Sequence, residues 1–223
     1  MIDLDTLALR LFELGAVKID TEVGFRLKLH ETNPGVPLSP IYLNLRTPEN
    51  PKPGPLTPEL VQDMGTLLWK EAIRIGFRFN AIAGLPNAGT PLAEAMKRAA
   101  YIGGLYLPTI SLNKAETAQG RRIDGIADYG GASKNDRVLI IDDLITRGDS
   151  KNEGIEALRT DGFEVTDVLV LVDREQGGAE DLKTFGVKLH SIITLDSILI
   201  KLHRYDRISE RQLETILRYL GRK

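Results

Sequence analysis

The order of apolar and polar positions along the chain predicts strands that alternate with helices. Apolar runs at 81–85, 137–141 and 165–172 have the length and composition of strands that are buried on both faces. Further strands are predicted at 23–29, 41–45, 104–110 and 188–194, and helices at 4–14, 59–75, 91–100, 149–161 and 209–220. This alternation is typical of a mostly parallel sheet covered by helices, so we expect an α/β protein.

Composition narrows the chemistry that the chain can perform. It has 223 residues, 29 Lys and Arg against 31 Asp and Glu, and no cysteine, which excludes disulfides, thiolate metal sites and a cysteine nucleophile. Its three histidines are too scattered for a multi-histidine metal centre. The near-neutral charge gives no electrostatic reason to expect a nucleic-acid partner. Carboxylates, cations, hydroxyls and backbone groups must therefore carry the chemistry.

The length and the hydropathy of the chain predict its class and compartment. A chain of 223 residues suits one domain with a sizeable core. No stretch approaches the roughly 18 to 20 apolar residues that a membrane span needs. The start, MIDLD, is acidic where a secretory signal would be basic. We therefore expect a cytoplasmic protein with no membrane partner.

The most informative segment is 138–150 (VLIIDDLITRGDS). A buried strand carries Asp142 and Asp143 to its carboxyl end, where ligands bind in open α/β sheets. The loop 146–150 then opens a helix, and Gly148 allows its N–H groups to approach an anion closely. This predicts a phosphorylated sugar whose phosphate lies in the loop and whose ribose hydroxyls, or a hydrated Mg²⁺, face the carboxylates. The alternative is that the aspartates merely end a strand and cap a helix.

This segment resembles the ligand motif of the type I phosphoribosyltransferases, and three further segments resemble those of the orotate phosphoribosyltransferase family. They are 25–28 (FRLK) with 39–46 (SPIYLNLR), 82–93 (IAGLPNAGTPLA) and 172–178 (VDREQGG). The resemblance implies a mostly parallel sheet flanked by helices, with a small N-terminal hood. It divides the single domain 1–223 into a base-binding hood (1–58), a core sheet (59–200) and a C-terminal helical segment (201–223).

The resemblance also implies a reaction, the transfer of a phosphoribosyl group from phosphoribosyl pyrophosphate to orotate, which gives orotidine 5′-monophosphate and pyrophosphate. Mg²⁺ would be carried by phosphoribosyl pyrophosphate near Asp142 and Asp143, with no direct protein ligand. The catalytic residues would be Lys114, Asp142 and Asp143. Contacts to phosphoribosyl pyrophosphate would come from Asn87, Ala88, Gly89, Lys114, Asp142, Asp143, Leu144, Ile145, Thr146, Arg147, Gly148, Asp149 and Ser150. Contacts to orotate would come from Lys28, Tyr42, Leu43, Thr146 and Arg174.

Those orotate contacts have plain structural alternatives. Tyr42 and Leu43 also fit ordinary packing within a strand. Lys28 and Arg174 suit the carboxylate and ring carbonyls of orotate because they are cationic donors, but each is also compatible with a solvated or paired surface charge. The turn at 30–38 and the proline-rich segment 47–58 are insertions beside the expected base pocket.

The polar connection 113–135 is long enough to be either disordered or a functional flap. The resemblance implies a homodimer in which this flap reaches the partner's site. Lys114 and Gly120 match the family pattern, whereas Asn113, Thr117 and Gln119 replace an arginine, a lysine and a histidine or tyrosine. Arg121 and Arg122 follow and could replace the lost charge. Two alternatives therefore stay open, an enzyme for another base and a non-catalytic regulator that binds phosphoribosyl pyrophosphate.

Overall fold

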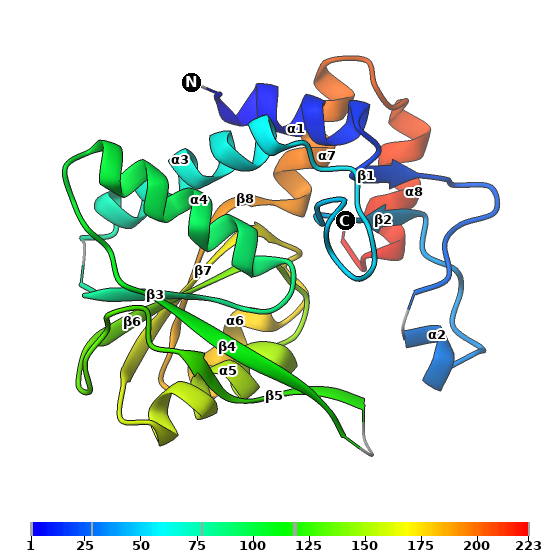
Figure 1. The fold of residues 1–223 in the computed structure, drawn as a ribbon. Coiled ribbons are helices and arrows are strands. Elements are labelled where there is room, and N and C mark those ends of the chain that lie inside the picture. Colours follow the sequence, from blue (N-terminus) through cyan, green and yellow to red (C-terminus); the bar gives the residue numbers. More distant parts are fainter. Residues whose placement is uncertain (1, 28, 77, 118–119, 223) are drawn as a thin grey trace.

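The structure, a computed structural model, describes residues 2–27, 29–76, 78–117 and 120–222. A six-stranded sheet in the order β5-β4-β3-β6-β7-β8 forms its centre (Figure 1). Neighbouring strands are parallel except for β4 and β5, which are antiparallel. The expected α/β fold is thus confirmed. The strands are β3 (Ala81–Gly84), β4 (Thr109–Thr117), β5 (Gly120–Asp128), β6 (Arg137–Ile145), β7 (Glu164–Asp173) and β8 (Lys188–Thr194).

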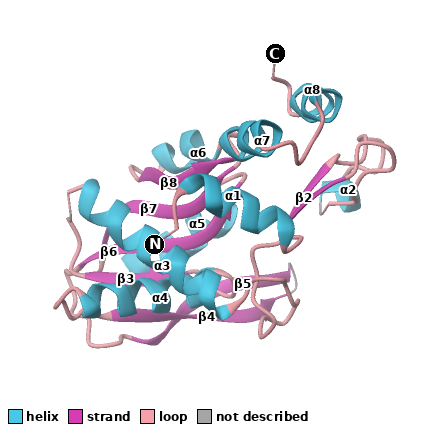
Figure 2. Ribbon diagram, turned by 90° about the horizontal axis from the view of Figure 1, so that it is seen from above, coloured by secondary structure: helices cyan, strands magenta, loops and turns pink. Residues whose placement is uncertain are grey.

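Two hydrophobic clusters cover the two faces of the sheet because side chains alternate along each strand. On β6, Leu139 and Ile141 belong to one cluster, and Val138 and Ile140 belong to the other. The first cluster includes residues of α1 (Leu4–Glu13), α3 (Pro58–Arg74), α4 (Gly89–Ile102), α7 (Leu195–Arg204) and α8 (Glu210–Tyr219). The second includes residues of α5 (Asp149–Thr160) and α6 (Gly178–Thr184) (Figure 2). The first cluster runs from Ile2 to Ile216, so the hood and the C-terminal segment share a core with the sheet.

The five predicted helices are present, and their starts follow ordinary capping chemistry. The Thr57 hydroxyl accepts a hydrogen bond from the Leu60 N–H, and Pro58 occupies the first turn of α3, where its missing N–H costs nothing. Ser209 and Gln212 form a capping box at α8. The sequence prediction missed α2 (Leu29–Thr32), α6 and α7. Of these, α2 and α6 span only four and seven residues, too short for a clear helical period.

The predicted strand at 23–29 is wrong. The hood sheet pairs β1 (Val17–Ile19), which was not predicted, with β2 (Ile41–Leu43) in antiparallel register. Between them lies the short helix α2, and the strand pairing of the described residues there is limited to an isolated bridge from Phe25 to Ser39. The reason is His30, which is 2% exposed and whose Nδ1 lies 2.8 Å from the Leu27 N–H, while Nε2 lies 3.0 Å from the Pro37 carbonyl. The imidazole thus takes the backbone partners that a strand would share with a neighbour.

The predicted strand at 104–110 and the polar segment 113–135 that follows it also differ from the prediction. The strand β4 begins only at Thr109 and continues into the presumed flap, where it forms an antiparallel hairpin with β5. Leu112 and Ile123 of this hairpin are buried in the cluster under α5. In addition, the Glu153 carboxylate on α5 accepts a hydrogen bond from the Ile123 N–H at 3.1 Å. Support from α5 therefore makes most of this segment regular structure rather than a long loop.

Candidate active site

The acidic pair lies within the last residues of β6 rather than after it, because the strand continues to Ile145. Asp142 is buried, and its Oδ2 lies 2.6 Å from the Nζ of Lys151 on α5. The Lys151 ammonium also donates to the Leu144 carbonyl at 2.6 Å. Lys151 was not among the predicted site residues, although a lysine in the first turn of the helix after an acidic strand was a usable signal. This pair neutralises Asp142 and joins β6 to α5.

Asp143 lies in a different electrostatic environment. Burial, followed by the negative charge of Asp142, raises the pKa of Asp143 to about 7, although Lys151 and the Leu144 N–H act in the opposite direction. The Leu144 N–H donates to Asp143 Oδ1 at 2.8 Å, and the Asp143 N–H donates to Asp142 Oδ1 at 2.9 Å. The Asp143 carboxyl therefore changes its charge near neutral pH.

This raised pKa predicts a stability that falls as the pH rises. Between pH 3.8 and about 7, folded Asp143 keeps a proton that the unfolded chain has released, so its contribution is fully present below this range and lost above it. Urea unfolding of the wild type and of Asp143→Asn at several pH values between 4 and 8 measures this contribution. We expect the variant to lose this downward component. Parallel pH dependences of the two proteins would contradict the assignment.

The turn at 86–89, predicted to contact pyrophosphate, lies directly against the acidic pair. A Cβ atom on Gly89 would lie 2.4 Å from the Ile141 carbonyl oxygen and 2.9 Å from Asp142 Oδ1, so only glycine fits there. Lys114, which β4 supplies, donates from Nζ to the Pro86 carbonyl at 3.1 Å. The structure thus brings Lys114, this turn and Asp142 together at the carboxyl ends of β3 and β6, as the sequence analysis expects.

The loop 146–150 follows β6 at the same edge of the sheet. The Gly148 N–H donates to Asp181 Oδ2 at 3.0 Å, and the Arg147 guanidinium lies 3.9 Å from Asp181 Oδ1. Asp181, from α6, was not predicted. Its carboxylate shows that this N–H group is oriented toward an anion, and a phosphate bound there must displace it. Thr146 is half-buried and Ser150 is exposed, whereas the side chain of Asp149 lies outside the described part.

Not every predicted loop residue can meet a ligand with its side chain. The Ile145 side chain is completely buried, and it packs so tightly on Gly178 that an added Cβ there would lie 2.5 Å away. Leu144 is half-buried and its carbonyl accepts from Lys151. The Ile145 side chain is therefore not available to a ligand, whereas the half-buried Leu144 already uses its carbonyl for Lys151.

The residues assigned to orotate differ in how they lie relative to the acidic pair. Lys28 lies outside the described residues. Tyr42 is half-buried, with its ring 5.9 Å from that of Phe25, and Leu43 is buried in the core. Among the described residues, no hydrogen bond or ion pair links Tyr42 to the acidic pair. Arg174 is nearer, since its N–H donates to the Ile145 carbonyl at 3.0 Å.

The Arg174 side chain carries a hydrogen-bond donor that an anion could satisfy. Its Nε is buried without a hydrogen-bond partner among the described residues, and burial lowers the pKa of the guanidinium. A buried donor without an acceptor is costly unless a ligand supplies one. A carboxylate oxygen would satisfy this group and offset the burial of its charge.

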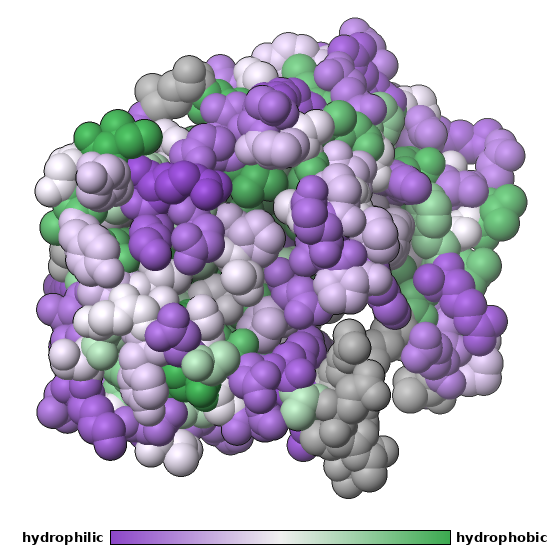
Figure 3. All heavy atoms as spheres, viewed as in Figure 1, coloured by the Kyte–Doolittle hydropathy of each residue, from purple (hydrophilic) through white to green (hydrophobic). Residues whose placement is uncertain are grey.

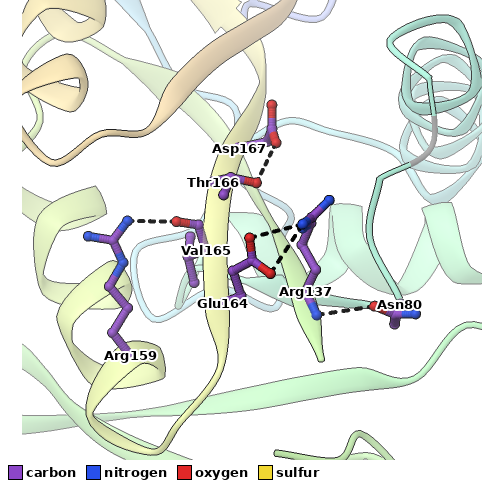
Figure 4. Close-up of polar contacts among 7 residues, drawn as sticks. All are labelled: Asn80, Arg137, Arg159, Glu164, Val165, Thr166 and Asp167. Atoms are coloured by element: carbon purple, nitrogen blue, oxygen red, sulfur yellow. Dashed lines mark hydrogen bonds and ion pairs between the residues drawn. The ribbon is translucent and has the colours of Figure 1, made fainter. Parts of the chain in front are cut away.

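The opposite edge of the sheet has a hollow of about 440 Å³ at the amino ends of β6 and β7, lined by residues such as Arg159 and Glu164. Figure 4 shows that its polar groups pair with one another. Arg137 contacts Glu164 at 3.0 Å, and Arg159 donates to the Val165 carbonyl at 2.7 Å. Although the Arg137 Nε beside this hollow is buried without a partner, the described residues that line the hollow include no pair of adjacent carboxylates like Asp142 and Asp143.

The described residues show neither a metal-binding cluster nor a helix that could span a membrane. No group of three or more His, Cys, Asp or Glu side chains among them is arranged to hold a metal ion. In the same residues, no helix combines the length and apolar character of a membrane span.

No family model matches the chain, but individual proteins do. It is 31% identical to the uridine 5′-monophosphate synthase of Bos taurus over 82% of its own length and 35% of that protein. It is 30% identical to the orotate phosphoribosyltransferase of Saccharolobus solfataricus over 82% of the chain and 85% of that protein. The crystal structure of the orotate phosphoribosyltransferase from Aeropyrum pernix superimposes with a TM-score of 0.68 at 28% identity, covering 89% of this chain and 98% of that one.

The sheet and the acidic strand with its loop define the phosphoribosyltransferase class of folds. Within that class, the chain belongs to the orotate phosphoribosyltransferase family, as the sequence resemblance indicates. The chain spans about a third of the length of the bovine relative.

Proposed function

We propose that the protein transfers the phosphoribosyl group of phosphoribosyl pyrophosphate to orotate, releasing pyrophosphate and forming orotidine 5′-monophosphate. One observation carries this proposal: Asp142, the turn at 86–89 and Lys114 meet at the carboxyl edge of the sheet, next to the 146–150 loop. This edge offers separate groups for a pyrophosphate, a ribose and a 5′-phosphate. Membership of the family supports orotate as the acceptor.

The reaction breaks the bond between C1′ of the ribose and the pyrophosphate oxygen, and forms a bond from C1′ to a ring nitrogen of orotate. No protein nucleophile is required, so the protein contributes orientation and electrostatic stabilisation. The 146–150 loop would hold the 5′-phosphate, and Asp143 would accept hydrogen bonds from ribose hydroxyls. Lys114 and the turn would stabilise the negative charge that develops on the leaving pyrophosphate. Arg174 would meet the orotate carboxylate.

The residues present fit a Mg²⁺ ion that arrives with the substrate. Mg²⁺ prefers carboxylate and phosphate oxygens and is commonly held by one or two carboxylates together with substrate phosphates. The resemblance assigns the ion no direct protein ligand, and Asp143 is the carboxylate that would lie near it, because Asp142 is already paired with Lys151. When bound, the ion would neutralise part of the charge of the pyrophosphate.

We also propose a homodimer, supported by an apolar group at the end of α4. Tyr101, Ile102 and Tyr106 are exposed, with Ile102 at 83%. Figure 3 shows a small hydrophobic area near the end of α4 on a mostly hydrophilic surface. It directly precedes β4, so a second copy docked here would lie near the base of the hairpin. Sedimentation equilibrium measures whether the protein is a dimer in solution. The cytoplasmic location remains a prediction from the sequence.

A turnover assay tests the proposed activity. We expect pyrophosphate release that requires both orotate and Mg²⁺, with a panel of other bases giving less product.

The competing proposal, a non-catalytic regulator, is favoured by the hairpin. Asn113 pairs with Asp124, and Arg122 lies 3.8 Å from Glu153, so both side chains already have partners other than pyrophosphate. Binding of phosphoribosyl pyrophosphate without any turnover would support the regulator and reject the enzyme.

A further inference from the structure

Asn50 joins the hood to the turn at 86–89. Its Nδ2 donates to the Asn87 carbonyl at 3.1 Å, across 37 positions of sequence. Its Oδ1 accepts hydrogen bonds from the Thr47 N–H at 2.7 Å and from the Thr47 hydroxyl at 3.2 Å. Asn50 is only 8% exposed. A buried amide that is bonded on both sides is a fixed connection between two segments.

The segment that carries Asn50 is the proline-rich insertion 47–58, to which the family resemblance assigns no role. The insertion is an ordered loop: the Gly54 N–H donates to the Thr47 carbonyl at 3.0 Å and the Leu56 N–H to the Arg46 carbonyl at 3.1 Å. A Cβ on Gly54 would lie 2.3 Å from the Arg46 carbonyl oxygen, so the two arms of the loop are in close contact. Its prolines restrict it further. Asn50 is therefore held in place independently of the turn that it contacts.

The contact with Asn87 sets the direction of a second group. The peptide bond between Asn87 and Ala88 is trans, so its carbonyl oxygen and its N–H point in opposite directions. Holding the Asn87 carbonyl toward Asn50 consequently aims the Ala88 N–H away from the hood loop. The Pro86 carbonyl is held by Lys114, and Gly89 rests on Asp142, so the turn is fixed at each of these points.

We infer that Asn50 is a positioning residue for the pyrophosphate half of the site, which it serves by fixing the Ala88 N–H as an anion donor. This inference rests on the proposed function. A donor that is already oriented stabilises developing charge without reorganisation during the reaction. The proline-rich insertion would then be part of the active-site framework rather than a variation of its rim.

Calorimetric titration with pyrophosphate plus Mg²⁺, and separately with ribose 5-phosphate, tests this role. We expect Asn50→Ala to bind pyrophosphate about tenfold more weakly, the loss typical of one oriented hydrogen bond, and ribose 5-phosphate as the wild type does. Asn50→Asp keeps the acceptor for Thr47 but loses the donor to Asn87, so it should bind pyrophosphate at least as weakly as Asn50→Ala. Its added charge is buried, so high salt should not restore the binding. In turnover, KM for phosphoribosyl pyrophosphate should rise while KM for orotate stays unchanged.

Thr47→Val is the matched control, because it removes a hydrogen bond inside the loop and leaves the contact between Asn50 and Asn87. It should bind both ligands like the wild type. Unchanged pyrophosphate affinity in the Asn50 variants, or an equal loss for both ligands, would overturn the inference while leaving the proposed function standing. A wild-type chain that binds no pyrophosphate would instead reject the proposed function, and this role with it.

Discussion

Replacing Lys151 by methionine should destabilise the protein by about 3–5 kcal/mol, because it leaves the buried Asp142 carboxylate without a partner. Methionine keeps most of the side-chain volume, so the loss reports on charge rather than on packing. The side chains of Lys151 and Asp142 are 6% and 8% exposed, so water cannot replace the ammonium. Urea unfolding at neutral pH measures the effect.

The double variant Asp142→Asn, Lys151→Met separates the effect of the ion pair from that of the hydrogen bond between Lys151 and the Leu144 carbonyl. If the unpaired charge causes the loss, the double variant should be more stable than Lys151→Met alone, since neither charge remains. A double variant that is no more stable would show that the Lys151 contact with the Leu144 carbonyl, rather than the ion pair, dominates. Both variants should also bind phosphoribosyl pyrophosphate poorly, because Asp142 supports the turn at Gly89.

Replacing Gly89 by alanine should reduce kcat/KM on the order of 10²-fold, the size of effect expected when a catalytic group is displaced by about 1 Å. The new methyl group would overlap the Ile141 carbonyl oxygen and approach Asp142 Oδ1. Either the turn or the end of β6 must move, and both belong to the proposed site. Steady-state kinetics with orotate and phosphoribosyl pyrophosphate give the value.

Gly35→Ala is the control for this substitution. Gly35 lies in the inserted turn of the hood, where a Cβ would meet nothing within 4 Å. The same chemical change there should leave kcat/KM unchanged. Comparable losses in the two variants would mean that glycine substitution acts through general destabilisation, and the tight fit at Gly89 would lose its functional meaning.

The local pattern predicted correctly those strands and helices whose own apolar residues already show which of their faces are buried. Residues 137–141 and 165–172 are apolar throughout because both faces of a central parallel strand are covered, and this pattern needs no knowledge of the partners. The strand predicted at 23–29 failed because a single buried imidazole, His30, redirected the backbone hydrogen bonds. The hairpin at 109–128 was read as a loop because its burial depends on α5, which follows it in the sequence.

The candidate site divides in the same way. Asp142, Asp143 and the glycines of the two loops could be named because they stand in ordered motifs, and Lys114 because it matches the family pattern. Asp181 and Asn50 could not, since each acts through a contact with a segment distant in sequence, whereas the position of Lys151 in the first turn after the acidic strand was a signal that was not used. Complementary charge and hydrogen bonding are properties of pairs, so a single position carries little sign of them.

The sequence alone determined the α/β fold, the family resemblance and the chemical groups at the carboxyl edge of the sheet, because periodicity and motif order are local properties of the chain. Only the tertiary structure decided which of these groups are already engaged. It neutralises Asp142 with Lys151, leaves Asp143 with a raised pKa, places Asp181 on the Gly148 N–H and ties the proline-rich loop to the turn at 86–89. The physical reason is that desolvation and pairing depend on which neighbours folding brings together.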